Sequence, residues 1–119
     1  MGKAHSWPDL VNPELTHLVG EGNYTWLHYK NGKSVLNAYT LKTWHNQRLP
    51  HFIRIHKGTL VDPNHVTKWL WDKHEIQIGD CFLRVSRRLF LSVWLAFMAW
   101  KQSTRDQIVW HSNYQKPKL

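Results

Sequence analysis

The stretch 52–66 constrains the fold of this chain more than any other part of the sequence. Its first half alternates apolar and polar side chains, and this period of two predicts a half-buried strand over 52–55. The cationic pair at 56–57 and a glycine follow, and the apolar pair at 60–61 then predicts a second short strand. Asp62-Pro63-Asn64 is a turn signal. Two strands around a basic loop would hold a lysine rigidly outside a sheet.

Two more hairpins are predicted in the rest of the chain. Asn31-Gly32 is the strongest short-range hairpin signal, and Gly79-Asp80 marks a second one. The segments predicted as strands around these turns and at the start of the domain are 15–19, 24–30, 34–38, 75–78 and 81–85. Together these segments favour a mainly antiparallel β domain.

Two helices are predicted. Thr40 can cap a short internal helix over 41–48, which ends because the residue before Pro50 avoids helical geometry. Ser86 can cap a second helix over 87–100 whose side chains are apolar on every face. Such a helix cannot leave most of its surface in water. One face is expected on the domain's own sheet and the rest, over Leu89 to Trp100, on a second copy; alternatively the sheet and the following tail wrap it completely.

Charge and composition narrow the function classes. Lys and Arg number 16 against 8 Asp and Glu, and the net charge of +8 favours a polyanionic partner such as nucleic acid, or a basic surface kept for solubility. The single cysteine, Cys81, excludes an internal disulfide and fits a reducing cytoplasm. Nine histidines lack metal-ligand spacing, and we find no catalytic motif, so neither a metal, a cofactor nor an enzyme activity is expected. No secretory signal is expected, and the longest apolar run is too short to span a bilayer.

Three segments, in order, carry a family resemblance. Glu21-Gly22-Asn23-Tyr24-Thr25, the core that begins at Phe52, and Val85-Ser86-Arg87-Arg88 resemble the entry, centre and exit motifs of LytTR-type DNA-binding domains, the output domains of many bacterial response regulators. Gly58 stands where that family usually has Ser, and Asp62 where it usually has Asn. The resemblance implies a mainly β fold with α, in which antiparallel sheets carry one short internal helix and a C-terminal apolar helix. The corresponding boundaries are 1–12 for an N-terminal extension, 13–101 for the domain, and 102–119 for a polar tail that is expected to be partly disordered.

The resemblance also implies a set of DNA contacts. Carried over by position, the base-contact residues are Tyr24 with Asn23 beside it, Lys57 and Arg87, in three separate loops that enter successive major grooves. Lys57 and Arg87 can donate to guanine O6 and N7, and Asn23 can pair with adenine. Residues more suited to phosphate contacts are Lys30, Lys33, Arg54, His56, Arg84 and Arg88.

Some of these assignments have structural alternatives. The alternative for Tyr24 is that it packs at a strand edge and makes no DNA contact. The alternative for Arg54 is an ion pair with Asp62 or Glu75 in place of a phosphate contact.

The function that follows is a stand-alone cytoplasmic transcriptional regulator of bacterial type, which binds double-stranded DNA as a homodimer. At 119 residues the chain has no room for a receiver domain, so a signal would arrive through a partner such as a signalling protein, through the apolar helix, or through expression level. The alternative is a protein-interaction module of the same fold that docks a partner or a membrane surface through Leu89 to Trp100.

Overall fold

The structure is a computed structural model that describes residues 10–104, and it contains two antiparallel sheets and two helices. The strands are β1 (Leu15–Glu21), β2 (Tyr24–Tyr29), β3 (Ser34–Asn37), β4 (Ile53–His56), β5 (Thr59–Val61), β6 (Lys68–Leu70), β7 (Glu75–Ile78) and β8 (Cys81–Arg84). The helices are α2 (Leu41–Gln47) and α3 (Phe90–Thr104), with 3₁₀ turns η1 (Pro63–His65) and η2 (Trp71–Lys73). The predicted fold class is confirmed.

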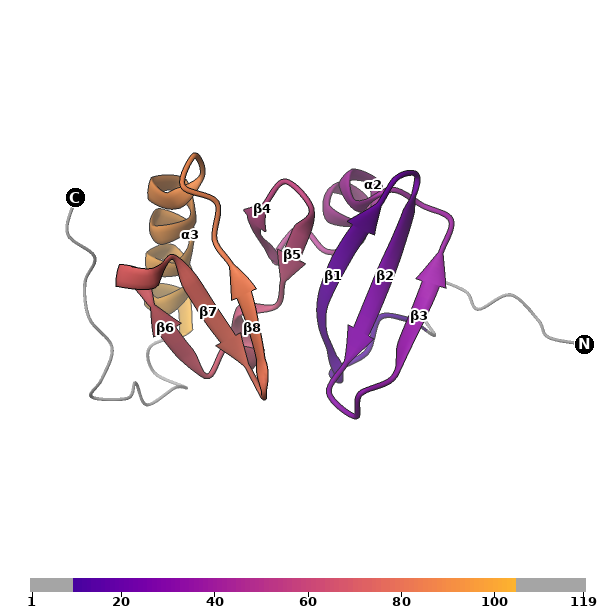
Figure 1. Ribbon diagram of the computed structural model, residues 1–119, viewed down its shortest axis with the longest axis horizontal. Helices are drawn as coiled ribbons and strands as arrows, with labels where there is room; N and C mark the ends of the chain where they lie inside the picture. The colour runs from indigo at the N-terminus through magenta and orange to yellow at the C-terminus, as the bar shows by residue number, and fades with distance from the viewer. Residues whose placement is uncertain (1–9, 105–119) are drawn as a thin grey trace, which may run out of the picture.

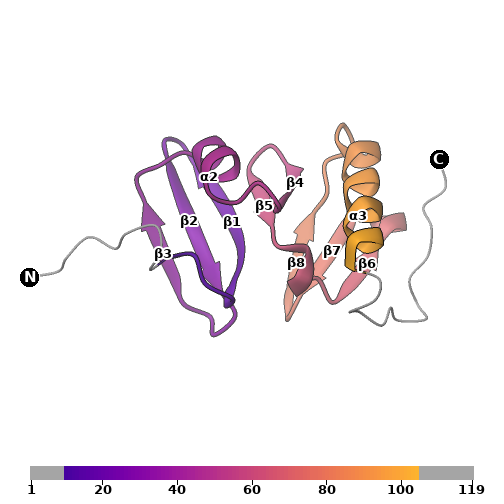
Figure 2. The same ribbon diagram turned by 180° about the vertical axis from the view of Figure 1, so that it is seen from behind.

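The two sheets lie side by side along the longest axis of the molecule (Figure 1). Sheet A has the strand order β3-β2-β1-β5-β4, and sheet B has the order β6-β7-β8. The view from behind shows α2 beside β1 and β5, and α3 in front of sheet B (Figure 2), where the helix also contacts β4. All three predicted hairpins form, and β1 continues to Glu21, two residues beyond its predicted end.

Each sheet has its own apolar core, and the β4–β5 hairpin contributes to both. Between sheet A and α2 the core includes Leu18, Leu27 and Leu60, three partners in adjacent strands. Side chains from the other face of β4 and β5 join the core between sheet B and α3, among them Ile55 and Val61. The alternation seen in the sequence therefore places one hairpin between two cores.

The internal helix forms as predicted. The Thr40 side chain accepts a hydrogen bond from the Thr43 amide at 3.2 Å, which satisfies one of the free N–H groups at the helix start. Leu41, Trp44 and Leu49 are buried against sheet A. The amide of Leu49 still bonds to the Trp44 carbonyl, and the chain then turns at Pro50.

The C-terminal helix begins and ends later than predicted. Its first residue is Phe90, because residues 86–89 form a turn in which the Leu89 amide bonds to the Ser86 carbonyl at 3.2 Å. The helix continues to Thr104, past the predicted domain boundary at 101. The rest of the predicted polar tail, from residue 105, and residues 1–9 of the predicted extension lie outside the described part of the chain.

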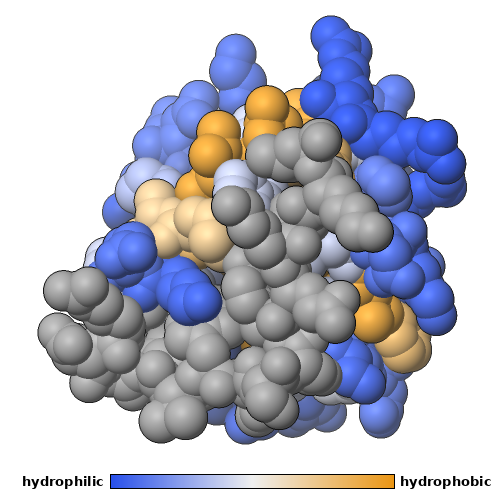
Figure 3. All heavy atoms as spheres, turned by 90° about the vertical axis from the view of Figure 1, so that its left-hand side faces the viewer, coloured by the Kyte–Doolittle hydropathy of each residue, from blue (hydrophilic) through white to orange (hydrophobic). Residues whose placement is uncertain are grey.

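Only part of the apolar surface of α3 is buried against the rest of the domain. Val93, Trp94 and Phe97 are buried, whereas Leu91 and Leu95 remain 52% and 53% exposed. Figure 3 looks onto this end of the molecule and shows hydrophobic surface beside hydrophilic side chains. One face of the helix thus packs on the domain, as predicted, and another carries exposed leucines.

Candidate nucleic-acid interface

Three loops that carry the predicted base-contact residues reach the same edge of the molecule (Figure 1). They are the β1–β2 turn with Asn23, the β4–β5 turn with Lys57, and the loop between β8 and α3 with Arg87. Two of these loops belong to sheet A, and the third follows the last strand of sheet B. The edge formed by these three loops is called the loop edge below.

Main-chain hydrogen bonds connect the three loops. The Gly20 amide, near the end of β1, donates to the Gly58 carbonyl in the β4–β5 turn at 2.9 Å. The Ser86 amide, which precedes Arg87, donates to the Ile55 carbonyl of β4 at 2.8 Å. The β4–β5 hairpin therefore lies between the other two loops and fixes both to itself.

Two side chains hold the β4–β5 turn that presents Lys57. The Arg54 Nε donates to the His56 carbonyl at 3.2 Å, and the same guanidinium donates to the Lys57 carbonyl. The His56 Nδ1 accepts a hydrogen bond from the Gly58 amide at 3.2 Å. With its main chain held, Lys57 leaves its side chain exposed to solvent.

The hydrogen bonds of the Arg54 guanidinium therefore stabilise the β4–β5 turn. Partial burial lowers the pKa of Arg54, because a charged group loses solvation there. Within residues 10–104 it forms no ion pair with Asp62 or Glu75, so that predicted alternative is wrong. Asp62 instead caps η1 by accepting from the Asn64 amide at 2.9 Å, a role that Asn, the family's usual residue, could also fill.

The arginines around the third loop are all exposed. Arg87 and Arg88 lie in the turn before α3, and Arg84 is the last residue of β8. Because the helix begins only at Phe90, Arg87 and Arg88 lie in the turn before it and not in its first turn.

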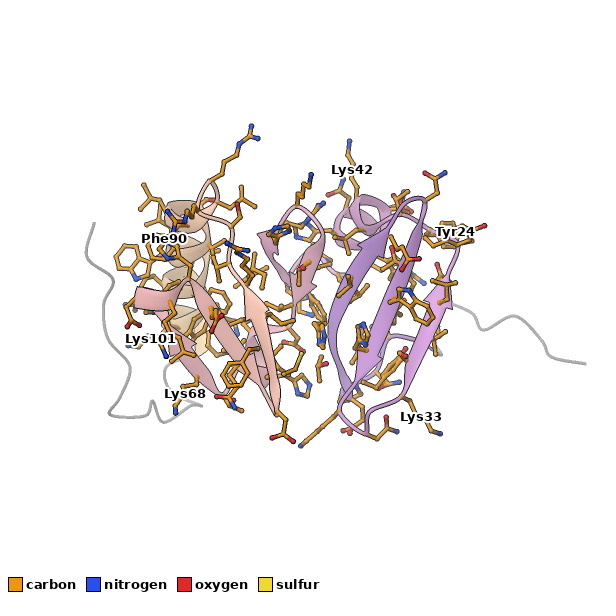
Figure 4. The ribbon with its side chains drawn as sticks, in the orientation of Figure 1. Tyr24, Lys33, Lys42, Lys68, Phe90 and Lys101 are labelled. Carbon is orange, nitrogen blue, oxygen red and sulfur yellow. The ribbon has the colours of Figure 1, made fainter. Side chains whose placement is uncertain are left out.

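The first loop offers one polar and one aromatic side chain. Asn23 is exposed in a tight turn whose first residue, Gly22, has a φ of 61° that side-chain-bearing residues rarely adopt. Tyr24 is 52% exposed. Figure 4 shows its ring at the outer side of sheet A near β3, so Tyr24 lies at the end of the loop edge.

The structure adds one cation to the loop edge and separates two others from it. Lys42, on α2, points away from the molecule at this edge (Figure 4). Helical spacing could have revealed it, since Leu41 and Trp44 face the core. Lys33 lies at the opposite edge of the sheet, and so does Lys30, whose amide bonds to the Glu14 carbonyl next to the start of β1. These two predicted phosphate contacts are not brought together with the rest.

In the described residues, no three His, Cys, Asp or Glu side chains are grouped so that they could hold a metal ion. None of the described helices has the length and apolar character needed to cross a membrane.

Comparisons with known proteins bear on this surface. The family model described as the LytTr DNA-binding domain matches residues 13–92, from two residues before β1 into the start of α3. Among solved structures, the LytTr DNA-binding domain of a Bacillus cereus protein described as a methyl-accepting/DNA response regulator aligns with a TM-score of 0.59. The two chains are 18% identical, and the alignment covers 71% of this chain and 81% of that one. The curated proteins give no match.

Proposed function

The chain belongs to the LytTR family of DNA-binding domains, and from this premise we propose that it binds specific double-stranded DNA sequences as a transcriptional regulator. The observation that supports the proposal is the loop edge, where three polar or basic loops are joined by main-chain hydrogen bonds. Fixed loops suit base recognition, because side chains must meet base edges in a defined geometry.

The proposed roles follow from position and chemistry. Lys57 and Arg87 donate to guanine in the major groove, and Asn23 pairs with adenine. Tyr24, at the end of the loop edge, contacts a base edge or a phosphate. The exposed cations Lys42, Arg84 and Arg88 complete the phosphate contacts nearby, and the half-exposed His56, whose Nδ1 accepts from the Gly58 amide, can donate to a phosphate through its Nε2. Arg54 supports the position of Lys57 rather than touching DNA.

The first experiment selects binding sites from a randomised duplex pool over a salt series and sequences what remains bound at physiological salt. Enrichment of a defined motif is expected. Binding that occurs only at low salt, with no enriched motif, would show a non-specific electrostatic attraction and contradict the proposal.

A matched pair of lysine variants then tests which edge binds. Lys57→Ala and Lys33→Ala each remove one turn lysine, but only Lys57 lies on the loop edge. Lys57→Ala should weaken binding to the selected motif by about 1–3 kcal/mol and relax one base position, whereas Lys33→Ala should bind like the original protein. Equal losses would place the DNA elsewhere.

Arg87→Ala is the second test of base reading, and Arg88→Ala is its neighbour for comparison. Loss of a bidentate contact to guanine should cost about 1–3 kcal/mol and flatten the preference at one position. Arg88→Ala should weaken all sequences alike, because a phosphate contact carries no sequence information. A uniform loss for Arg87→Ala would make it a phosphate contact instead.

We further propose that two copies associate through α3. Leu91 and Leu95 are one helical turn apart and about half exposed, so a second copy of the helix could cover them. Leu91→Lys with Leu95→Lys should convert the protein to a monomer in light-scattering measurements, while Ser92→Lys, an exposed polar neighbour, should not. An unchanged mass for the double variant would refute the association.

The same two leucines support the alternative function, an interaction module that docks a different partner protein. The two functions are distinguished by the binding-site selection above. A module without DNA binding would enrich no motif, and its partner would be lost in the Leu91→Lys, Leu95→Lys variant.

A further inference from the structure

A fourth loop reaches the loop edge, at the end that carries Tyr24. It is the segment between β3 and α2, residues 38–40, and both ribbon views place it beside the β1–β2 turn at the end of this edge (Figure 1 and Figure 2). Lys42 follows it on α2 and points away from the molecule (Figure 4). Along the longest axis, the β8–α3, β4–β5 and β1–β2 loops are therefore followed by the β3–α2 loop.

Hydrogen bonds on both sides of Tyr39 hold the main chain of the β3–α2 loop. The buried Thr25 hydroxyl donates to the Tyr39 carbonyl at 2.8 Å, and the Tyr39 amide donates to the Asn37 Oδ1 at 2.9 Å. The same Oδ1 accepts a hydrogen bond from the Trp44 Nε1 at 3.2 Å. Because Thr25 follows Tyr24 in β2, these bonds fix the fourth loop to the strand that leaves the first.

The side chain of Tyr39 takes no part in these three hydrogen bonds, and it is 48% exposed. A phenolic hydroxyl can donate to a phosphate oxygen, and tyrosine is among the residues that contact the DNA backbone in this way. Tyrosine also adds contact area at a low cost in conformational entropy, because few of its bonds rotate. A half-exposed tyrosine on a fixed loop is therefore well prepared to bind.

The charge around this loop suits a polyanion. Residues 22–61, from the β1–β2 turn to the end of β5, contain six Lys or Arg and no Asp or Glu. Lys42 is one of these cations and is exposed. Glu21, the carboxylate that precedes the segment, accepts a hydrogen bond from the Trp26 Nε1 at 3.1 Å. Since cations near phosphates supply much of the affinity for DNA, a phosphate beside Tyr39 would lie in favourable surroundings.

We propose that the β3–α2 loop makes a fourth DNA contact, in which the Tyr39 hydroxyl donates to a backbone phosphate and Lys42 supplies positive charge beside it. The contact lies in the flank next to the bases at the Asn23 end of the loop edge. It extends the bound length of duplex without adding a base preference, because phosphates carry no sequence information. The inference rests on the proposed DNA binding, and its test separates the two.

The test uses the selected motif in duplexes in which one backbone phosphate at a time is replaced by a neutral methylphosphonate. In the original protein, replacement at a phosphate in the flank at one end of the motif should weaken binding by about two- to tenfold. Tyr39→Phe keeps the ring and every main-chain bond of the loop. It should lose about two- to tenfold on unmodified DNA, and the penalty at that phosphate should shrink while the penalties at other phosphates stay the same.

Two lysine variants control for charge. Lys42→Gln should weaken binding and reduce the slope of log affinity against log salt by about one, whereas Tyr39→Phe removes no charge and should leave the slope unchanged. Lys33→Gln changes an exposed cation at the opposite edge and should bind like the original protein.

The proposal is overturned if Tyr39→Phe binds with unchanged affinity, or if the penalty at the flanking phosphate is the same in the variant and in the original protein. If the selection enriches no motif, the proposed function fails, and Tyr39→Phe is compared with the original protein on a random-sequence duplex at low salt. A weaker variant would then still support the contact, and equal binding would overturn it.

Discussion

Arg54 and Lys57 are three residues apart, yet their surroundings assign them different tasks. The Arg54 guanidinium is engaged with two carbonyls of its own turn, whereas the Lys57 side chain is exposed. Sequence position alone treated both as DNA contacts. Only the hydrogen bonds distinguish a residue that positions the turn from one that reaches beyond it.

This difference can be measured with Arg54→Lys. Lysine keeps the charge but cannot bond both carbonyls with a planar fork, so specific DNA affinity should fall while the salt dependence of binding stays the same. Lys57→Ala, by contrast, should also relax the preference at one base position, because Lys57 is proposed to donate to a base edge. If Arg54→Lys binds normally, Arg54 acts through its charge alone and the positioning role is wrong.

His17 should make stability depend on pH. The pKa of His17 is lowered to about 4 by burial and by His28, so the unfolded chain takes up a proton before the folded one as the pH falls. Its stabilising contribution is complete above pH 6.5 and is lost progressively down to pH 4. Burial also lowers the pKa values of His28 and His45, with the same sign.

Urea unfolding at pH 7.5 and pH 5 checks this expectation. The free energy of unfolding should be lower at pH 5 by roughly 1–2 kcal/mol on account of His17. In His17→Phe that part of the decrease should vanish. A variant with the full decrease would locate the titration in other groups.

At the scale of elements, α2 was predictable because its signals are local. Thr40, the apolar spacing of Leu41 and Trp44, and Pro50 lie within eleven residues. The start of α3 was not predictable in the same way. The Ser86 amide bonds to the Ile55 carbonyl, thirty-one positions earlier, and this contact keeps residues 86–89 in a turn. No local pattern reports such a bond.

Thr40→Ala should destabilise the domain through α2 alone. The variant loses the hydrogen bond from the Thr43 amide, which typically costs about 1 kcal/mol. Thr40→Ser keeps a hydroxyl cap and should remain close to the original stability. Chemical denaturation of the three proteins provides the comparison, and equal losses for both variants would show that the methyl group matters instead of the cap.

At the scale of the whole molecule, the sequence predicted most of the strands but not how the two sheets pack against each other. The position of Lys30 and Lys33 opposite the loop edge follows from the register of β2 between β1 and β3. Register joins residues that are distant in sequence, so charge pattern alone could not assign these lysines to an edge.

The shared β4–β5 hairpin predicts that the two cores unfold together. Leu27→Ala in one core and Ile76→Ala in the other should each cost about 2–5 kcal/mol, since both side chains are fully buried. Amide hydrogen exchange should accelerate by the same factor in β2 and β7 for either variant. Acceleration confined to the mutated half would show two independently unfolding units.

The bonds between the three loops have a consequence for how such a protein diversifies. They use the main-chain atoms of Gly20, Gly58, Ile55 and Ser86, and not the side chains of Asn23, Lys57 or Arg87. Substitutions at the loop tips therefore leave the framework between the loops intact. Mutations that change recognition therefore alter different atoms from those that hold the loops in place. A lineage with this arrangement can change its preferred target one base pair at a time without losing the fold.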